Sequence, residues 1–216
     1  IVIKLYMNLK NYYYFFQSAI PERICDDIVK YAKQTKDKIA KIGKYENTKK
    51  LNKKEIKDLK EVRDSNVVWL NDTWIYKEIH PLLNNANVNA GWNFDWDFSE
   101  SCQFTKYKKG QFYNWHCDSY IEPYNNQNNP LDPMNHKIRK LSISVNLSDP
   151  KDYKGGEIQF DFRNTESKKI EIKTCKEILP KGSLIVFPSF VWHRVSPVTS
   201  GERNSLVLWN LGYPFK

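Results

Sequence analysis

The spacing of apolar residues along the chain changes close to Gly91. Before this point apolar residues mostly recur every three or four positions, which predicts amphipathic helices. The first helix is expected to begin near Pro21, because proline is favoured in the first helical turn. A second helix is expected over residues 73–87, with Pro81 kinking or interrupting it. Residues 35–60 are polar and lysine-rich, which predicts a solvated loop with part of a helix.

After Gly91 the alternation has a period of two, which is typical of β-strands. It is clearest at residues 141–147, where the apolar side chains share one face. A further segment, 111–118, leads out of a turn. About eight strands are expected, over residues 94–98, 102–107, 141–147, 157–162, 169–172, 183–187, 191–195 and 205–211. Many short strands joined by Gly-, Pro- and Asp-rich turns predict a mainly β fold, a double-sheet jelly roll with helices outside one sheet.

The length of 216 residues predicts one domain, residues 1–216. We expect a helical lead-in with flanking helices over residues 8–91 and the β core over 92–216. Residues 121–137 are rich in Asn and Pro and predict a mobile loop. No apolar run approaches the roughly 20 residues of a membrane span, and no export signal is visible. Four scattered cysteines without a C-x-x-C pair fit reduced thiols, so a cytoplasmic location is expected.

Positive charge dominates the composition, with 34 Lys and Arg against 25 Asp and Glu, a formal net charge of +9. Such a balance is compatible with a nucleic-acid partner. However, much of the lysine lies between Lys33 and Lys60 and is accompanied by frequent asparagine, as AT-rich coding would produce. We therefore interpret the charge as compositional bias on solvated surface rather than as a nucleic-acid interface.

The segment His116-Cys117-Asp118 is the sharpest local feature. On an extended chain residues two apart point to the same face, so the imidazole and the carboxylate would converge while Cys117 points away. His193 lies far along the chain in an apolar segment. Taken singly, these features are also typical of a polar surface strand and of a core histidine. Together, two histidines and one carboxylate form the facial triad that suits non-haem Fe(II) and leaves three coordination positions open.

Arg203 follows His193 by ten residues, after a turn over residues 197–202. We expect this turn to return the next strand antiparallel to the His193 strand, with Arg203 projecting into the same cavity. An unpaired guanidinium in an apolar barrel is costly, so Arg203 predicts an acidic partner. A dicarboxylate cosubstrate that chelates the iron through its other end would supply that partner. The alternative is a surface arginine in a turn.

Several ordered motifs extend over residues 101–209. They are Tyr107-x-x-Gly110-x-x-Tyr113-x-x-His116-x-Asp118, Leu147-Ser148-Asp149-Pro150, Tyr153-Lys154-Gly155-Gly156-Glu157, Pro180-x-Gly182-x-Leu184-x-Val186-Phe187 and His193-Arg194-Val195-x-Pro197-Val198-x-x-Gly201-x-Arg203. In this order they resemble the prolyl 4-hydroxylase-like Fe(II)/2-oxoglutarate-dependent dioxygenases, in particular their bacterial and phage group. The resemblance implies a double-stranded β-helix oxygenase core, in a bacterial or phage-infected cell.

The resemblance also implies the roles of individual residues. His116, Asp118 and His193 would bind Fe(II), with 2-oxoglutarate and O2 as cosubstrates and ascorbate as reductant. Arg203 would pair with the distal carboxylate of 2-oxoglutarate, and these four residues form the expected catalytic set. Two further residues are expected to contact the cosubstrate: Tyr107 on the strand before the triad, and Asn146, where some relatives have a tyrosine.

Two tryptophans, Trp115 and Trp209, would line the substrate mouth or serve only as packing. Gly155-Gly156 is read as a tight turn, and His80 and His136 as ordinary polar positions.

The implied activity is that of a procollagen-proline 4-dioxygenase-like enzyme acting on a proline-containing peptide or protein, with release of succinate and CO2. Since fold similarity does not fix the substrate, a free amino acid or small metabolite stays open. Nucleic-acid demethylation is disfavoured because Trp209 stands where those relatives usually have a second arginine. A catalytically silent jelly roll that binds protein or nucleic acid is the hypothesis of another class. The oligomeric state is not indicated.

Overall fold

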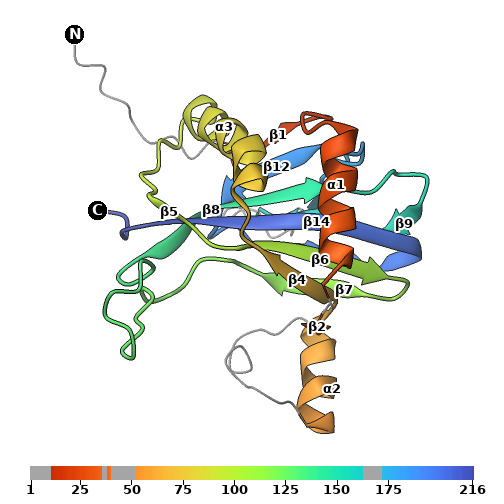
Figure 1. Cartoon of the computed structure of the whole chain (residues 1–216), viewed down its shortest axis with the longest axis horizontal. Helices are drawn as coiled ribbons and strands as arrows, with labels where there is room; N and C mark the ends of the chain where they lie inside the picture. The colour runs from red at the N-terminus through yellow and green to blue at the C-terminus, as the bar shows by residue number, and fades with distance from the viewer. Residues whose placement is uncertain (1–10, 36–37, 40–51, 163–171) are drawn as a thin grey trace.

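Two antiparallel β-sheets face each other, and helices cover the outer face of the larger sheet (Figure 1). The computed structural model describes residues 11–35, 38–39, 52–162 and 172–216. The two facing sheets confirm the expected mainly β fold with flanking helices. No helix among these residues is long and apolar enough to cross a membrane.

The larger sheet has nine strands and the smaller sheet has five. In the larger sheet the order is β1 (Tyr14–Phe16), β12 (Leu184–Pro188), β8 (Ile138–Asn146), β14 (Val198–Gly212), β6 (Cys102–Lys108), β4 (Asn66–Leu70) and β2 (Lys38–Ile39). Two further strands, β5 (Phe98–Ser99) and β9 (Tyr153–Gly155), pair with β14. The smaller sheet runs β11 (Ile172–Thr174), β10 (Ile158–Asp161), β13 (His193–Val195), β7 (Phe112–His116) and β3 (Arg63–Asp64).

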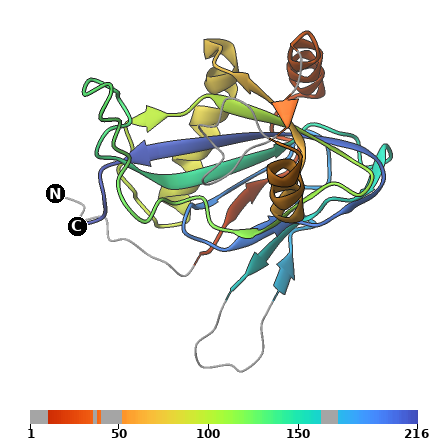
Figure 2. The ribbon, with the colours of Figure 1, turned by 90° about the horizontal axis from the view of Figure 1, so that it is seen from below.

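Helices α1 (Glu22–Lys33) and α3 (Thr73–Asn89) lie on one side of the larger sheet, while the β10–β11 hairpin projects on the other (Figure 2). One core cluster joins their apolar faces, with Ile28 and Leu83 among its members, to the outward side chains of β8, β12 and β14. A second cluster fills the space between the sheets and includes Phe160, Ile185 and Phe187. Burial of both faces fixes the register of the larger sheet, because a slip by one residue would exchange the two sets of side chains.

Helix α3 runs from Thr73 to Asn89 with Pro81 inside it, so the proline does not interrupt the helix. The remaining helix, α2 (Lys53–Val62), begins with a capping box. In it the side chains of Asn52 and Glu55 each accept a hydrogen bond from the other residue's backbone N–H. It occupies the end of the lysine-rich stretch, where part of a helix was expected, and residues 40–51 before it lie outside the described residues.

Strands β1, β2, β3 and β4 occur within residues 8–91, where a helical lead-in with flanking helices was expected. Strand β4 is short and pairs with β6, so tertiary pairing rather than local periodicity determines its conformation. The opposite difference occurs at residues 94–97, where a strand was expected. There the side chain of Asn87 takes the place of a neighbouring strand, because it accepts from Phe94 N at 3.0 Å and donates to Phe94 O at 2.9 Å.

The expected pairing of the Arg203 strand with the His193 strand is wrong. Strand β13, which carries His193, pairs with β7 and β10 in the smaller sheet. Strand β14, which carries Arg203, pairs with β5, β6, β8 and β9 instead. The chain therefore crosses from one sheet to the other between the two residues, and they reach the interior from facing sheets rather than from adjacent strands.

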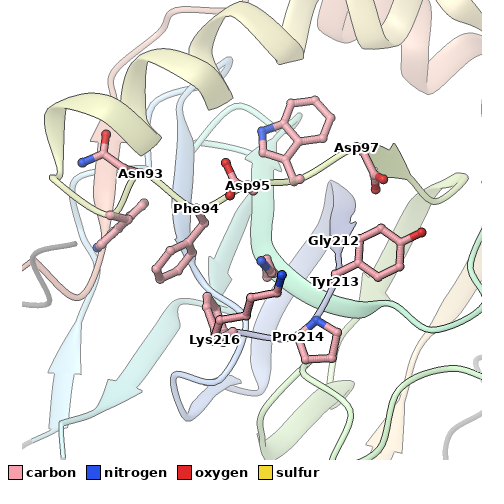
Figure 3. A pocket seen from close by; sticks show the side chains of 12 residues that line it. Asn93, Phe94, Asp95, Asp97, Gly212, Tyr213, Pro214 and Lys216 are labelled. Carbon is pink, nitrogen blue, oxygen red and sulfur yellow. The ribbon is translucent and has the colours of Figure 1, made fainter. Parts of the chain in front are cut away.

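A pocket of about 460 Å³ lies where the chain leaves α3 and where β14 ends (Figure 3). Residues 92–97 and 212–216 form most of its wall, and Lys140 of β8 also lines it. The backbone holds the two walls together, since Asp97 N donates to Leu211 O at 2.9 Å.

Candidate metal and cosubstrate site

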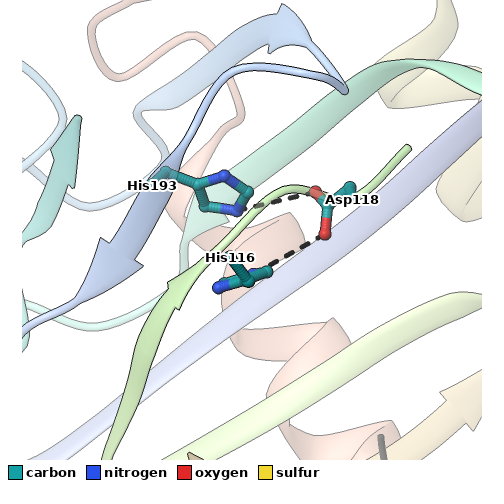
Figure 4. Close-up of side chains that lie close together, drawn as sticks. All are labelled: His116, Asp118 and His193. Carbon is teal, nitrogen blue, oxygen red and sulfur yellow. Dashed lines mark ion pairs between the residues drawn. The ribbon is translucent and has the colours of Figure 1, made fainter. Parts of the chain in front are cut away.

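The fold brings His116, Asp118 and His193 together between the two sheets (Figure 4). Their possible ligand atoms all lie within 4.8 Å of one another. His193 opens β13 and is the cross-strand neighbour of His116 at the end of β7, while Asp118 follows two residues later. The Nε2 atoms of His116 and His193 each lie 3.6 Å from a different oxygen of Asp118. Cys117 is exposed, as its opposite orientation requires.

Backbone carbonyls orient both imidazoles. His116 Nδ1 lies 2.7 Å from the carbonyl oxygen of Asn114, and His193 Nδ1 lies 3.0 Å from that of Val191. A carbonyl can only accept, so in the neutral rings Nδ1 carries the hydrogen and the Nε2 lone pair faces Asp118. This is the tautomer that a metal ligand needs, held by the kind of outer contact that accompanies ligating histidines.

Asp118 is held by the strands on either side of it. Its Oδ2 accepts a hydrogen bond of 2.7 Å from Ser142 Oγ of β8, and Ser142 Oγ lies 2.8 Å from Ser189 Oγ. The backbone N–H of Asp118 donates to Ser189 O at 2.8 Å. These contacts fix the carboxylate toward the histidines. Ser142 and Ser189 were missed by sequence reasoning, because a serine in an apolar strand carries no signal of this role.

Burial sets the protonation of the cluster. It lowers the pKa of His116 to about 3, and the neighbouring His193 adds to the effect. Burial alone would raise the pKa of Asp118, but the two histidines, Arg139 and the Ser142 hydrogen bond outweigh it and lower that pKa. At neutral pH His116 is therefore neutral and Asp118 is ionised, which are the forms that bind a metal ion.

A β-bulge places Tyr113 beside the first histidine. Along the β7–β13 pair, His193 faces His116 and Val195 faces Tyr113, so between these pairs two residues of β7 oppose one of β13. The Tyr113 ring consequently stacks on the His116 ring with their centres 3.5 Å apart. Simple alternation puts residues three apart on opposite faces, so the only sequence signal for Tyr113 was its place in the motif.

Arg63 extends this stack outward from β3. Its guanidinium carbon lies 4.4 Å from the centre of the Tyr113 ring. The same group donates to Ser65 Oγ at 3.0 Å and to Gln103 Oε1. The stack therefore ties the strands before Gly91 to the metal cluster.

Arg203 lies in the interior opposite Tyr107, its cross-strand neighbour on β6. Both residues are only 3% exposed, and the guanidinium carbon is 5.9 Å from the centre of the tyrosine ring. Among the described residues, no carboxylate lies within ion-pair distance of Arg203. Gly156 has a φ of +70° and leaves room for the arginine stem, since an added Cβ would come within 3.0 Å of Arg203 Cδ. A buried cation that has space for its side chain and no nearby carboxylate among the described residues is suited to bind the carboxylate of a ligand.

Asn146 makes backbone contacts, and Trp115 takes the packing role that was one of its two expected roles. Asn146 donates its side-chain amide to Ser148 O at 3.1 Å and to Leu179 O at 2.7 Å, so the backbone uses both of its N–H groups. Trp115 lies beneath Arg194, whose guanidinium carbon is 4.7 Å from the centre of the tryptophan ring. Because Arg194 follows His193 on β13, it points to the outer face, and Trp115 therefore lies away from the metal cluster.

Trp209 does border the site, together with a buried ion pair that sequence reasoning missed. Arg139 lies 3.9 Å above the Trp209 ring and forms two hydrogen bonds of 2.6 Å with the carboxylate of Glu100. A second β-bulge explains the omission: Leu141 faces Asn210 while Arg139 faces Leu211, so β8 has an extra residue there. Alternation carried back from residues 141–147 placed Arg139 on the outer face, and the bulge turns it inward.

The other two histidines lie apart from the cluster. His80 on α3 hydrogen-bonds Ser99 Oγ at 3.0 Å, and His136 lies in the 121–137 loop with a φ of +64°. That loop, expected to be mobile, contains hydrogen bonds of 2.8 Å from Tyr124 N to Lys137 O and from His136 N to Tyr124 O.

The double sheet with a His-x-Asp…His cluster in its interior defines a class of protein, the double-stranded β-helix with a two-histidine, one-carboxylate site. Residues 102–210 match the family model described as the 2OG-Fe(II) oxygenase superfamily, and the chain belongs to this superfamily.

Sequence relatives point the same way. A PKHD-type hydroxylase of Xanthomonas euvesicatoria is 35% identical over 107 residues, which cover 49% of this chain and 41% of the relative. A PKHD-type hydroxylase of Synechococcus is 36% identical over 105 residues, 48% of this chain and 38% of the relative. The chain thus spans less than half the length of the curated relatives that it matches.

Solved structures share the fold. A Pseudomonas putida prolyl-4-hydroxylase matches with a TM-score of 0.62 and 18% identity, covering 93% of this chain and 92% of that one. The viral collagen prolyl hydroxylase of Paramecium bursaria Chlorella virus-1, in its 2OG complex, matches with a TM-score of 0.59 and 22% identity over 94% and 97% of the two chains. A Trichoplax adhaerens prolyl hydroxylase in complex with a hypoxia-inducible-factor peptide matches with a TM-score of 0.60 and 13% identity, over 93% and 84%.

The donor set fits the metal that the family name specifies. Two imidazoles present Nε2 toward one carboxylate on a single side of the site, which is the 2-His-1-carboxylate arrangement of non-haem Fe(II). The lone guanidinium of Arg203 fits the distal carboxylate of 2-oxoglutarate in the same interior.

Proposed function

We propose that this protein is an Fe(II)- and 2-oxoglutarate-dependent hydroxylase that acts on a prolyl residue of a peptide or protein and releases succinate and CO2. The observation that carries the proposal is the pairing of the His116–Asp118–His193 cluster with an uncompensated Arg203 in one buried interior. A metal cluster alone would fit many activities, but the second, cationic site restricts the cosubstrate to one with a free carboxylate.

The residues divide the work by position. His116, Asp118 and His193 hold Fe(II) from one side, and Ser142 keeps the carboxylate oriented through its 2.7 Å hydrogen bond. When bound, Fe(II) with 2-oxoglutarate and O2 supplies oxidative decarboxylation, which places one oxygen atom in succinate and the other in a substrate C–H bond. Arg203 fixes the distal carboxylate, so the orientation of the cosubstrate is set before reaction.

Tyr107 is proposed as a hydrogen-bond donor to the cosubstrate. It lies opposite Arg203 on the neighbouring strand, and its burial at 3% exposure keeps water from that end of the site. Asn146 has no part in this proposal, because backbone carbonyls use its amide hydrogens.

The surroundings of the cluster favour a peptide with a compact apolar side chain. Trp69 and Trp209 lie with ring centres 6.1 Å apart, and Glu100 neutralises Arg139 beside them. The described residues thus offer aromatic surface beside the cluster, and the charge of Arg139 there is neutralised. The Trichoplax relative of this fold is described in complex with a peptide, which supports the same substrate class.

Turnover of 2-oxoglutarate tests the proposal. We expect the protein, with Fe(II), ascorbate and labelled 2-oxoglutarate, to form succinate faster when proline-containing peptides are added. Mass spectrometry should then show a product heavier by one oxygen, with fragmentation placing it on proline. Product formed only with free amino acids would instead support the small-metabolite alternative.

Variants distinguish an enzyme from a silent binding module. His116→Ala and Asp118→Ala should each abolish succinate formation, because they remove proposed ligands. His80→Gln is the matched control, since this histidine lies outside the cluster and glutamine can keep the contact with Ser99. Full activity of either ligand variant would show that the ligand set is wrong. Absence of turnover and of metal uptake in the unmodified protein would overturn the enzyme assignment.

A further inference from the structure

The side chains of two buried cations in the described part of the chain, Arg203 and Lys140, have neither a hydrogen bond nor an ion pair with the other described residues. Lys140 is 5% exposed. The two remaining buried basic residues show the usual arrangement. Lys137 pairs with Asp97 at 2.8 Å, and Arg63 donates to Ser65 and Gln103. The proposed cosubstrate explains Arg203, and Lys140 has no such explanation.

The bulge in β8 determines where Lys140 points. Because Arg139 is turned inward over Trp209, Lys140 and Leu141 both face outward, toward the helix side of the larger sheet. Lys140 is therefore separated from the metal cluster by the sheet itself. There it lines the pocket of about 460 Å³, which is within the roughly 300–1,000 Å³ of small-molecule sites (Figure 3).

The pocket is built for a flat apolar group. Its lining includes the aromatic residues Phe94, Trp96, Tyr213 and Phe215. The Lys140 ammonium lies 4.7 Å from the centre of the Phe215 ring, and the Phe94 and Phe215 rings meet edge to face at 4.7 Å. An ammonium among aromatic rings gains some attraction from their faces, but this does not replace a hydrogen-bonding anion.

Charges around the pocket limit the kind of anion. Asp97 already pairs with Lys137, and Asp95 is exposed at the rim. Burial lowers the pKa of Lys140, and both carboxylates offset this only in part, which agrees with a cation that lacks a close counter-charge. Three cations, Lys137, Lys140 and the lining Lys216, face two carboxylates, Asp95 and Asp97, and the one excess positive charge matches a ligand with a single negative charge rather than a dianion such as a phosphate ester.

We propose that the pocket formed by residues 92–97 and 212–216 binds a small aromatic monocarboxylate, with its carboxylate on Lys140 Nζ and its ring among Phe94, Trp96 and Phe215. The site is separate from the metal cluster and does not depend on the proposed hydroxylase activity.

Calorimetric titration with 3-phenylpropanoate tests the site. We expect saturable binding that weakens at least tenfold when the neutral isostere 3-phenylpropanamide replaces the acid. Lys140→Met, which keeps the apolar stem and removes the charge, should weaken binding of the acid to the same extent. Lys216→Met removes an equal charge from an exposed lining residue and should change the affinity less than twofold.

Binding at the cosubstrate site must be separated from binding at this pocket. Arg203→Met should leave the affinity for 3-phenylpropanoate unchanged, and loss of binding in this variant would place the probe at Arg203 and overturn the proposal. Equal affinity for the acid and the amide would also overturn the proposal. So would the absence of a saturable heat of binding at probe concentrations up to about 10 mM. The comparison of acid with amide uses the unmodified protein, so it is decisive even if Lys140→Met fails to fold.

Discussion

Two carbonyl contacts decide the chemistry of the metal cluster at the scale of single residues. Each orients one imidazole through Nδ1, so that both Nε2 atoms face Asp118. Burial then keeps His116 neutral far below the usual pKa of histidine. The protein therefore presents its ligands in binding form before the metal arrives, and the cost of that arrangement should be visible in the metal-free protein.

Acid should destabilise the metal-free protein through His116. Its pKa is about 3 in the folded protein, whereas an unfolded histidine titrates near 6.5. Between these pH values the unfolded state binds a proton on His116 that the folded state does not bind. The free energy of unfolding is therefore highest above about pH 6.5 and falls by up to about 1.4 kcal/mol per pH unit below it. Urea unfolding with EDTA at pH 7, 6 and 5 measures this slope.

His116→Asn should give a shallower slope over the same interval, because the variant lacks the titrating group. His136→Asn is the control, since this histidine is exposed on the loop and should keep the slope of the unmodified protein. Identical slopes in all three proteins would mean that His116 is not held neutral by the fold.

At the scale of elements, two β-bulges build the site. One in β7 brings Tyr113 onto His116, and one in β8 turns Arg139 inward and Lys140 outward. Bulges re-aim side chains near functional sites at the expense of regular pairing. Both lie beside the metal cluster, where regular strands would have left Tyr113 and Arg139 pointing away.

The bulges also mark the limit of what sequence alone could predict. Alternation located most core strands, and the two-residue spacing of His116 and Asp118 correctly implied convergence, because both depend on local geometry. An extra residue in a strand is defined only against its partner, so the orientation of Tyr113 and Arg139 was not readable. The same holds for β4, whose conformation depends on pairing with β6.

Gly156 at the end of β9 should be essential for the position of Arg203. An added Cβ would lie 2.9 Å from Val198 Cγ2 and 3.0 Å from Arg203 Cδ. We expect Gly156→Ala to raise the KM for 2-oxoglutarate about tenfold, equivalent to about 1.4 kcal/mol of binding free energy. Steady-state kinetics at saturating peptide measures it.

Gly110→Ala is the matched control for this change. Gly110 also has a positive φ, +86°, but no atom lies within 4 Å of an added Cβ. Both variants should lose about 1 kcal/mol of stability from backbone strain, whereas only Gly156→Ala should lose cosubstrate affinity. Equal KM values in the two variants would show that the glycine serves the backbone alone.

At the scale of the whole molecule, the two sheets meet through the site, since the metal cluster lies between them while Arg203 belongs to the larger sheet. Ligands that bind both parts should therefore stabilise the entire fold. The sequence predicted a helical part before Gly91 and a β part after it. In the structure, strands from before Gly91 belong to both sheets, which composition and periodicity could not indicate.

Metal and cosubstrate together should raise the melting temperature. At 100 times the Kd, a ligand adds about 2.7 kcal/mol to stability, and a domain of this size gains about 2–4 °C per kcal/mol, so we expect a rise of about 5–10 °C. Thermal unfolding with anaerobic Fe(II) and 2-oxoglutarate measures it. EDTA should reverse the rise and Asp118→Ala should prevent it, whereas an equal rise in that variant would contradict the ligand assignment.

Strand β14 links the folding of the larger sheet to the completion of the site that contains Arg203. It lies between β8 and β6, yet it is the last described strand to be synthesised. Until β14 pairs, one edge each of β6 and β8 stays unpaired and open to wrong partners. Arg203 lies on that strand, so the residue proposed to bind the cosubstrate takes its place only when those edges close. One pairing event therefore both protects the fold from aggregation and completes the proposed site.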